Sequence, residues 1–486
     1  MGIGIIGCGV YIPMYRLRTE EIADVWGGGA TGGVSERAVP GADEDVITMA
    51  TEAAFNAFEH AAVEPSEVGA VFFATSSAPY VEGRLSSVLA DALGLKEDAI
   101  RTELGFSARA GVVALWNCVN AIKAGELDTA LVVASDSLIG APGTPSEFKM
   151  GAGAAALLVG KDGTIADFGS FCMFSTDLPY RWRRNESIYV EEIDDPRVER
   201  DFGYVRHVSS AIRALLQKSG AKLSDYQHVV LDQPDAQLPR ALARALKFDG
   251  GGLRDEQWRH TIVASEIGCA GVATCLISLV KTLDVAKPSE RILVASYGAG
   301  AGSGAFELTV TEQIEKRRGR ARRVEEYLRR KEYVGYGVYE RFLGMVKRAE
   351  YAPLIPSVPA YMRNMPYKLR LVGFKCKSCG EINLPRRRIC RRCEKPSEFE
   401  EVKLSRRGRL YTFTIVEYGP PGLERKYAIG VAELKEGVRL IGRLTDCKPE
   451  DAKVDMPVEL VLRKVIERGG LVEYGYAFRP LRGGAE

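Results

Sequence analysis

Short apolar runs alternate with longer helical patterns along the chain from its start to Phe306. Apolar runs bounded by turns are typical of buried strands. Ile3–Pro13 reads as a buried first strand, and Ala70–Ser76 and His228–Pro234 have the same character. Because such strands lack a regular polar face, helices are expected on both sides of the sheet. The pattern predicts an α/β protein with a mostly parallel sheet.

Two long segments of this part repeat the same pattern. Gly111–Asp136 and Gly271–Tyr297 each open on glycine and continue as a strongly apolar helix. Each then passes through a short polar turn into a buried strand that contains Ala-Ser. The alternative is chance similarity between generic strand–helix units. We interpret the repeat as two similar halves packed together, with expected bounds 1–165 and 166–348.

The composition changes after the second half. Tyr351–Pro366 holds four prolines, and proline is excluded from a regular helix interior, so we expect a linker over 349–372. Beyond it, short apolar segments alternate with turns, which is typical of a small β-barrel of the oligonucleotide/oligosaccharide-binding (OB) type. Its expected bounds are 398–486, and its expected strands are Arg409–Glu417, Ala428–Leu434, Val438–Leu444 and Val458–Lys464.

Four cysteines lie between linker and barrel in two closely spaced pairs. Cys376 and Cys379 form one pair, and Cys390 and Cys393 form the other. Four thiolates complete a tetrahedral Zn²⁺ site without an open coordination position, so the metal would fold this segment and not catalyse. We therefore predict a structural zinc ribbon over 373–397. The basic residues around it are either solvated surface or a site for an anionic ligand.

Composition excludes several other classes. The 486 residues carry a formal net charge of +2, so no overall field favours nucleic acid or a membrane surface. No apolar stretch has the length of a membrane span, and the first residues lack a signal-peptide pattern. The six remaining cysteines are scattered, which indicates reduced thiols and a cytoplasmic protein.

Nine segments follow one another along the first 345 residues: Ile3–Pro13 (IGIIGCGVYIP), Ala74–Tyr80 (ATSSAPY), Glu103–Leu115 (ELGFSARAGVVAL), Leu127–Asp136 (LDTALVVASD), Asp177–Arg184 (DLPYRWRR), Leu231–Pro239 (LDQPDAQLP), Ile267–Leu279 (IGCAGVATCLISL), Ala286–Phe306 (AKPSERILVASYGAGAGSGAF) and Val324–Gly344 (VEEYLRRKEYVGYGVYERFLG). At these points the chain resembles 3-hydroxy-3-methylglutaryl-CoA synthase of the thiolase superfamily. Positions 366 to 482 resemble the zinc-ribbon/OB partner domain known as DUF35, here fused. The resemblance implies a duplicated five-layer αβαβα core and a CoA thioester as substrate.

The resemblance also implies a mechanism, from which this chain departs. In that superfamily a cysteine at the start of a buried helix takes the acyl group, and a glutamate and a histidine transfer protons. Here Ala108 stands at the cysteine position and Ser76 at the glutamate position. Asp232 stands at the histidine position, and Cys269 replaces an active-site asparagine. Alanine cannot be acylated, so the ordinary condensation mechanism is not expected.

Three functions are compatible with these replacements. The first is an aldolase-type acyl-CoA lyase, which needs a base and an oxyanion hole but no acyl-enzyme, with Asp232 and Tyr297 transferring protons and Ser76 a further candidate. The second is a synthase or acyltransferase with its nucleophile relocated to Cys269. The third is a non-catalytic subunit that binds acyl-CoA or scaffolds a thiolase or other enzyme. A homodimer is expected by analogy, and the expected CoA contacts are Arg183, Arg184, Gly300 and Gly302.

Overall fold

The computed structural model describes residues 2–248, 251–346, 358–417, 426–468 and 470–481. The chain divides into two units, Met1–Leu343 and Gly344–Glu486. Across the described residues, no helix combines the length and the apolar composition that a membrane crossing requires.

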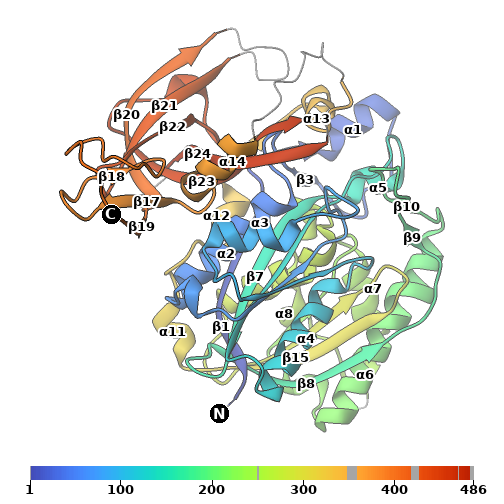
Figure 1. Ribbon diagram of the computed structural model, residues 1–486. Helices are drawn as coiled ribbons and strands as arrows, with labels where there is room; N and C mark the ends of the chain where they lie inside the picture. Colours follow the sequence, from blue (N-terminus) through green and yellow to red (C-terminus); the bar gives the residue numbers. More distant parts are fainter. Residues whose placement is uncertain (1, 249–250, 347–357, 418–425, 469, 482–486) are drawn as a thin grey trace. The chain divides into compact units, whose positions relative to one another are not determined.

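A nine-stranded sheet forms the centre of the first unit (Figure 1). Its order is β11-β14-β15-β8-β1-β7-β6-β4-β5. The repeat seen in the sequence appears as symmetry about the central β8–β1 pair, because β4, β6, β7 and β1 have β11, β14, β15 and β8 as counterparts. The strands are β1 (Gly4–Tyr11), β4 (Ala70–Ala74), β5 (Ile100–Leu104), β6 (Thr129–Ser137), β7 (Ala152–Gly160), β8 (Ala166–Phe174), β11 (His228–Leu231), β14 (Arg291–Tyr297) and β15 (Ser303–Val310).

The sheet is mixed, so the prediction of a mostly parallel sheet is wrong. Only β4–β5, β4–β6 and β11–β14 pair in parallel. The pairs β1–β7, β1–β8, β6–β7, β14–β15 and β15–β8 are antiparallel. The apolar pattern indicates that both faces of the sheet are covered, and β7 is indeed buried at every position. The same pattern carries no information on strand direction.

Two helices lie between the strands of the two halves, and the other helices cover the outer faces of those strands. The five layers are therefore helix, strand, helix, strand and helix. α10 (Thr274–Leu283) contacts β7 and β1 of one half and β11 and β14 of the other. α4 (Ala110–Ala124) packs on β6 and β4, and its Val112 lies against Gly304 of β15. The outer helices are α2 (Val46–Ala61) on β1 and β7, α3 (Leu85–Leu93) on α2, β4 and β5, α6 (Arg206–Ser219) on β8 and β15, and α8 (Asp255–Trp258) on β11.

The remaining elements of the first unit surround the ends of this sheet. A small sheet has the order β16-β2-β3, and two hairpins pair β9 with β10 and β12 with β13. These elements are β2 (Tyr15–Arg18), β3 (Glu36–Val39), β9 (Arg181–Trp182), β10 (Glu191–Glu192), β12 (Lys247–Phe248), β13 (Gly251–Gly252), β16 (Glu332–Tyr333), α1 (Thr19–Trp26), α5 (Pro145–Lys149), a π-helix (Val198–Val205), α7 (Leu238–Ala245), α9 (Ala264–Ile267), α11 (Gln313–Arg317), α12 (Val324–Arg329) and α13 (Tyr336–Phe342).

The second unit contains a ribbon and a small barrel. The three-stranded sheet β18-β17-β19 holds the cysteine pairs, and the five-stranded sheet has the order β22-β21-β20-β23-β24. A bridge between Leu444 and Phe478 nearly closes the five strands into the expected barrel. The strands are β17 (Val372–Cys376), β18 (Ile382–Asn383), β19 (Phe399–Lys403), β20 (Arg407–Val416), β21 (Tyr427–Leu434), β22 (Arg439–Arg443), β23 (Pro457–Arg468) and β24 (Leu471–Pro480).

The expected linker is partly helical. Residues 347–357 lie outside the described residues, but α14 (Val358–Lys368) forms where no regular helix was expected and holds Pro366 in its interior. The proline is tolerated because it falls in the last turn, so the missing N–H removes one hydrogen bond near an end. Leu369 N–H closes that turn on the carbonyl of Met365 at 2.9 Å.

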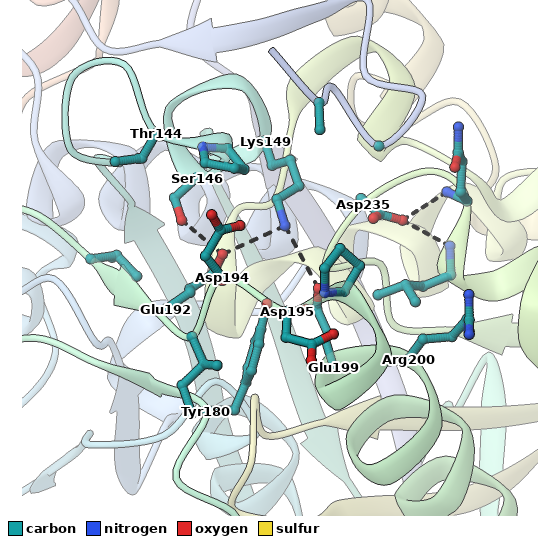
Figure 2. Close-up of a pocket in the computed structure, with 18 of the residues that line it drawn as sticks. Thr144, Ser146, Lys149, Tyr180, Glu192, Asp194, Asp195, Glu199, Arg200 and Asp235 are labelled. Carbon is teal, nitrogen blue, oxygen red and sulfur yellow. Dashed lines mark hydrogen bonds and ion pairs between the residues drawn. The ribbon is translucent and has the colours of Figure 1, made fainter.

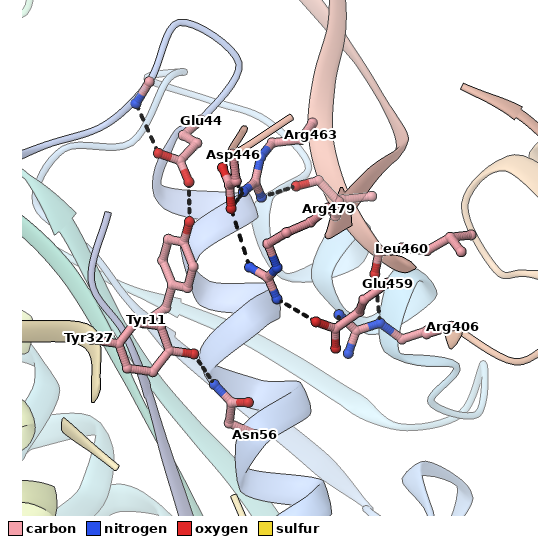
Figure 3. Close-up of polar contacts among 12 residues, drawn as sticks. Tyr11, Glu44, Asn56, Tyr327, Arg406, Asp446, Glu459, Leu460, Arg463 and Arg479 are labelled. Atoms are coloured by element: carbon pink, nitrogen blue, oxygen red, sulfur yellow. Dashed lines mark hydrogen bonds and ion pairs between the residues drawn. The ribbon is translucent and has the colours of Figure 1, made fainter. Parts of the chain in front are cut away.

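Charged side chains are buried within each unit (Figure 3). In the first unit, Tyr11 donates to Glu44, and Asn56 donates to the Tyr327 hydroxyl at 2.8 Å. In the barrel, Arg463 lies 3.2 Å from Asp446, although its side chain is only 1% exposed. Burying a guanidinium requires this pairing, because an unpaired ion in the interior loses its hydration without compensation.

Candidate functional site

The turn that leads into α4 carries Ala108, where the resemblance places a nucleophile. The Ala110 N–H bonds the Ser107 carbonyl at 2.9 Å, which fixes this turn. Ala108 is half-buried and packs against the apolar cluster that contains Tyr204 and Tyr297. Its methyl group has no covalent chemistry to offer. The Ser107 hydroxyl lies 3.5 Å from the carbonyl of Gly298, and among the described residues no histidine forms a hydrogen bond with it.

Ser76 is held by a buried carboxylate that the sequence did not single out. Asp136 is fully buried at the end of β6. It accepts hydrogen bonds from the hydroxyls of Thr75, Ser76 and Ser77, and from the N–H groups of Ser76, Ser77 and Val272, all at 2.7–3.0 Å. The Ser76 hydroxyl therefore points at Asp136. This carboxylate ties the end of β4 to the segment that enters α10.

Asp232 is buried at the end of β11 and is bound to main chain on both sides. Its carboxylate accepts the Gln233 N–H at 2.9 Å and the Tyr297 N–H at 2.8 Å. Burial raises the pKa of Asp232 to about 7, although the two hydrogen bonds stabilise the carboxylate and lower the pKa. The predicted role of Asp232 in proton transfer stays a prediction, and its structural role is to join β11 to β14.

Asp232 should lower the stability of the folded protein as the pH rises from about 4 to about 7. Between its unfolded pKa of 3.8 and its folded pKa of about 7, the unfolded chain releases a proton that the folded chain keeps. The associated stability is complete below the unfolded pKa and is lost as the pH rises through the folded pKa. Asp232→Asn has no proton to lose, so its unfolding free energy relative to wild type should rise by up to about 4 kcal/mol over this interval. Urea denaturation at pH 4, 5.5, 7 and 8 measures this, and parallel pH curves would refute it.

Tyr297 at the end of β14 and His207 of α6 bring two buried polar side chains close together. The Tyr297 hydroxyl and His207 Nδ1 are buried and have no hydrogen-bond partner among the described residues. Their rings lie 5.9 Å apart. Burial lowers the pKa of His207, helped by Arg206 and Arg109, and burial raises the pKa of Tyr297. Tyr297 therefore keeps its proton at neutral pH and can act as a hydrogen-bond donor, whereas His207 is a neutral imidazole.

Cys269 lies in the interior and has the environment of an unreactive thiol. It is 3% exposed and packs with Leu138, Met150 and Val190. Burial raises the pKa of Cys269, although Arg181 opposes the rise. A reactive cysteine needs a stabilised thiolate and access, and this one has neither. Its predicted role as a relocated nucleophile stays a prediction that the burial does not favour.

The expected CoA contacts are separated in the structure. Arg184 lines a cavity and pairs with Glu191 at 2.8 Å, whereas Arg183 donates to the Ser76 carbonyl. Gly300 and Gly302 have φ values of +111° and +115°. A Cβ on either glycine would stand 2.1–2.2 Å from a main-chain carbonyl, so close packing of the backbone accounts for both glycines.

The large cavity of the first unit has a volume of about 1360 Å³. Its walls come from β9, β10, α5, the π-helix and α7, and Figure 2 shows its polar side chains. Exposed arginines and a tryptophan surround its rim: Trp182, Arg184, Arg200, Arg240 and Arg244. Ala108, Ser76, Asp232, Cys269 and Tyr297 are not among the residues that line it.

Buried ionic groups form one wall of this cavity. Lys149 Nζ lies 3.5 Å from Glu192 and 3.6 Å from Glu199, and Arg181 pairs with Glu192 at 2.6 Å. Asp235 lines the same cavity and accepts two main-chain N–H groups of α7's first turn at 2.8 Å. We call Lys149, Arg181, Glu192, Glu199 and Asp235 the ionic wall. Sequence reasoning missed it, because these five residues lie in separate segments of the chain, among other charged or polar residues, and only folding brings them together.

The carboxyl groups of the ionic wall differ in proton affinity. Burial raises the pKa of Glu192, but Arg181 and Lys149 outweigh burial and bring it down to about 2. Burial raises the pKa of Glu199, and Lys149 opposes the rise only in part. Burial also raises the pKa of Asp235, against the hydrogen bonds from the Leu238 and Gln237 N–H groups. Burial lowers the pKa of Lys149, but its carboxylate neighbours reverse this and raise it. Lys149 and Glu192 are therefore charged at neutral pH, while Glu199 and Asp235 hold protons more readily than ordinary carboxyls.

The four cysteines of the ribbon gather as predicted from their spacing. Their sulfur atoms all lie within 4.8 Å of one another. The distance is 3.9 Å between Cys376 and Cys393 and 3.6 Å between Cys379 and Cys390. A tetrahedral Zn²⁺ with Zn–S bonds of about 2.3 Å places its sulfurs about 3.8 Å apart, so this cluster fits such an ion. Asn383 donates to the Cys390 sulfur at 3.5 Å, and the Ser397 hydroxyl lies 2.9 Å from the Cys376 sulfur.

Both units have known relatives. A family model described as ChsH2, C-terminal OB-fold domain, matches residues 401–463. The hydroxymethylglutaryl-CoA synthase of Methanocaldococcus jannaschii is 36% identical over 349 residues, covering 71% of this chain and 99% of that protein. The enzyme of the same name from Pyrobaculum arsenaticum is 37% identical over 353 residues, with the same coverage of 71% and 99%.

Solved structures show the same fold. A crystal structure of HMG-CoA synthase complexed with CoA has a TM-score of 0.64 at 20% identity, covering 70% of this chain and 90% of that one. MvaS in complex with 3-hydroxy-3-methylglutaryl coenzyme A has a TM-score of 0.65 at 22% identity, covering 73% and 94%. The fold is therefore that of the thiolase-like acyl-CoA condensing enzymes. Within that class, the chain belongs to the hydroxymethylglutaryl-CoA synthase family.

Proposed function

We propose that this chain cleaves or forms a carbon–carbon bond of a β-hydroxyacyl-CoA by aldol chemistry, without an acyl-enzyme. The observation that carries the proposal is the cavity, which combines an arginine-bearing rim with a buried wall of acid and base groups. On this rim Arg184 pairs with Glu191 and Arg200 pairs with Asp201, so Arg240 and Arg244 are the groups proposed to bind the phosphates of CoA, since guanidinium groups bind phosphate oxygens in pairs. Ala108, at the position that the family resemblance gives to the nucleophile, supports a reaction that needs none.

The proposal is tested with purified protein and 3-hydroxy-3-methylglutaryl-CoA, together with shorter and longer β-hydroxyacyl-CoA esters. Mass spectrometry follows release of the shorter acyl-CoA and the carbonyl product. A second assay offers acetyl-CoA and acetoacetyl-CoA and follows free CoA. Cleavage without labelling of any cysteine by acyl-CoA supports the aldolase. Stoichiometric acylation at Cys269 with condensation activity would instead support the relocated-nucleophile synthase, and binding of none of the esters would overturn the proposal.

A second candidate is a non-catalytic subunit that binds acyl-CoA or scaffolds a thiolase-type enzyme. It draws support from the engagement of Ser76 by Asp136 and of Asp232 by main chain, which leaves neither group on the cavity surface. The barrel, which resembles the C-terminal OB-fold domain of ChsH2, is a further element available for partner binding. Tight binding of CoA esters without turnover, with co-purification of an active enzyme, would favour it.

The proposed function includes a bound Zn²⁺ in the ribbon and a homodimer in the cytoplasm. The dimer draws support from β5, an edge strand of the nine-stranded sheet. Ile100 on β5 is 53% exposed, Phe106 beyond it is fully exposed, and Trp116 of α4 is 43% exposed. Exposed apolar groups along an unpaired sheet edge favour association with a second strand.

Changing this edge should dissociate the dimer. The double variant Ile100→Lys and Phe106→Glu places charges on the apolar edge, and we expect its mass in solution to fall from twice 53.1 kDa to that of one chain. Size-exclusion chromatography with light scattering measures this. Ile441→Lys, at a position 76% exposed on the barrel, is the matched control and should leave the mass unchanged. A wild-type protein that elutes as a monomer at micromolar concentration would contradict the dimer.

A further inference from the structure

We propose that Glu199 and Lys149 are the proton-transfer pair of the cavity, with Glu199 as the base and Lys149 as the group that stabilises a developing enolate. The inference deepens the proposed aldol function and rests on it. Both side chains line the cavity, whereas the residues that the family resemblance singles out do not. Figure 2 shows Lys149 reaching between Glu192 and Glu199.

Glu199 is the carboxyl group of the ionic wall with an unused acceptor. Its side chain is only 5% exposed, and its Oε1 has no hydrogen-bond partner among the described residues. Glu192, by contrast, is occupied by Arg181, by Lys149 and by the Ser146 hydroxyl at 2.7 Å. A buried carboxylate oxygen without a partner is costly, so its persistence points to a ligand group that binds there.

The charges of the ionic wall leave room for one mobile proton. Two cations, Lys149 and Arg181, face three carboxyl groups: Glu192, Glu199 and Asp235. Full ionisation would leave one uncompensated negative charge in a buried site. Since Glu192 is held ionised, Glu199 and Asp235 share the exchangeable proton, and with that proton on Asp235 the Glu199 carboxylate lies beside Lys149 and can accept a proton from the substrate.

The backbone of Glu199 is also unusual. It lies in the first turn of the π-helix Val198–Val205, which continues directly into α6. π-Helical turns are rare because their wider winding weakens the backbone packing, and they occur frequently at functional sites. Here the wider turn places Glu199 against the cavity while α6 remains packed on β8 and β15.

The step balances without a cofactor. The Glu199 carboxylate accepts the proton of the β-hydroxyl, the bond between Cα and Cβ breaks, and its electron pair forms the enolate of the thioester. The Lys149 ammonium donates a hydrogen bond to the enolate oxygen. After the carbonyl product leaves, the proton on Glu199 passes to Cα, which yields the shorter acyl-CoA and restores the carboxylate. No oxidant, reductant or net proton is required.

Two readouts test the pair in the full chain. The first is cleavage of 3-hydroxy-3-methylglutaryl-CoA, and the second is exchange of the acetyl-CoA methyl protons in D₂O, which reports enolate formation whatever the preferred acyl chain. Glu199→Gln and Lys149→Met should each lower both rates by 100-fold or more, as expected for loss of a proton-transfer or oxyanion-stabilising group. Binding of CoA esters, measured by calorimetry, should change less than about threefold in Glu199→Gln, since Gln keeps the size of the side chain.

Two further variants serve as controls for a purely structural effect of the Glu199 substitution. Glu199→Asp keeps a carboxyl group and should recover part of the activity lost in Glu199→Gln, which a purely structural role would not predict. Glu186→Gln changes an exposed glutamate of the loop between β9 and β10 that does not line the cavity, and it should behave as wild type. If wild type shows turnover or exchange and the rates of Glu199→Gln stay within threefold of the wild-type rates, the assignment of Glu199 and Lys149 as the proton-transfer pair is overturned. The proposed aldolase function is not affected by that result. Bound CoA esters with neither turnover nor exchange in wild type would overturn both.

Discussion

Removing the metal from the ribbon should unfold residues 373–397 while the first unit stays folded. Four thiolates within 4.8 Å of one another repel strongly unless a cation lies between them. Metal binding to such clusters contributes on the order of 10–16 kcal/mol in isolated zinc modules, far more than this short segment obtains from its own core. We expect one zinc per chain by atomic emission, and its loss in Cys390→Ser. Limited proteolysis should then cut within the ribbon, while the thermal transition of the first unit stays within about 2 °C.

The control for this experiment lies in the same knuckle. Ser378→Ala changes an exposed side chain between Cys376 and Cys379 and should leave the zinc content at one per chain. A ribbon that resists proteolysis after complete removal of zinc would show that the cysteines fold the segment without metal.

Asp136→Ala should be the most destabilising single substitution near the head of α4. The carboxylate accepts six hydrogen bonds from four residues, and its removal leaves buried N–H and hydroxyl donors of the β4 end and of Val272 without an acceptor. Loss of such a group costs about 3–5 kcal/mol, which corresponds to a fall in Tm on the order of 5–10 °C. Differential scanning calorimetry and urea denaturation measure both quantities.

Asp128→Ala is the matched control for Asp136. Its carboxylate precedes the same strand, is 90% exposed and, within the described part of the chain, pairs with Lys161 alone at the surface. Because exposed ion pairs contribute little, this variant should stay within about 0.5 kcal/mol of wild type. A similar loss for both aspartates would show that the hydrogen bonds of Asp136 are not what stabilises this region.

The cysteine spacing and the duplicated apolar pattern were reliable in the sequence because each depends on local chemistry. Two closely spaced cysteine pairs can close on a metal through short turns, whichever fold surrounds them, and the four sulfurs do gather. The repeat between Gly111–Asp136 and Gly271–Tyr297 reappears as two matching sets of strands about the β8–β1 pair. Strand direction was not predictable, since burial on both faces looks the same in parallel and antiparallel sheets.

The candidate site residues also fall into two groups, those singled out from the sequence and those that only folding brings together. Position along the sequence directed attention to Ser76, Asp232 and Cys269, yet folding turns the first toward Asp136, binds the second to main chain and buries the third. The ionic wall could not be read from the sequence, because Lys149 and Glu199 look like ordinary surface charges in polar segments.

What the sequence by itself determined is the class of protein: a duplicated α/β core of the hydroxymethylglutaryl-CoA synthase family, with a ribbon and an OB-type barrel. These features follow from periodicity, spacing and similarity, which are properties of the linear chain. Only the tertiary structure decided which polar groups face the cavity and which serve as internal connections. The physical reason is that proton affinity and access depend on burial and on partners distant in sequence, and Lys149 meets Glu192 and Glu199 only after the chain has folded.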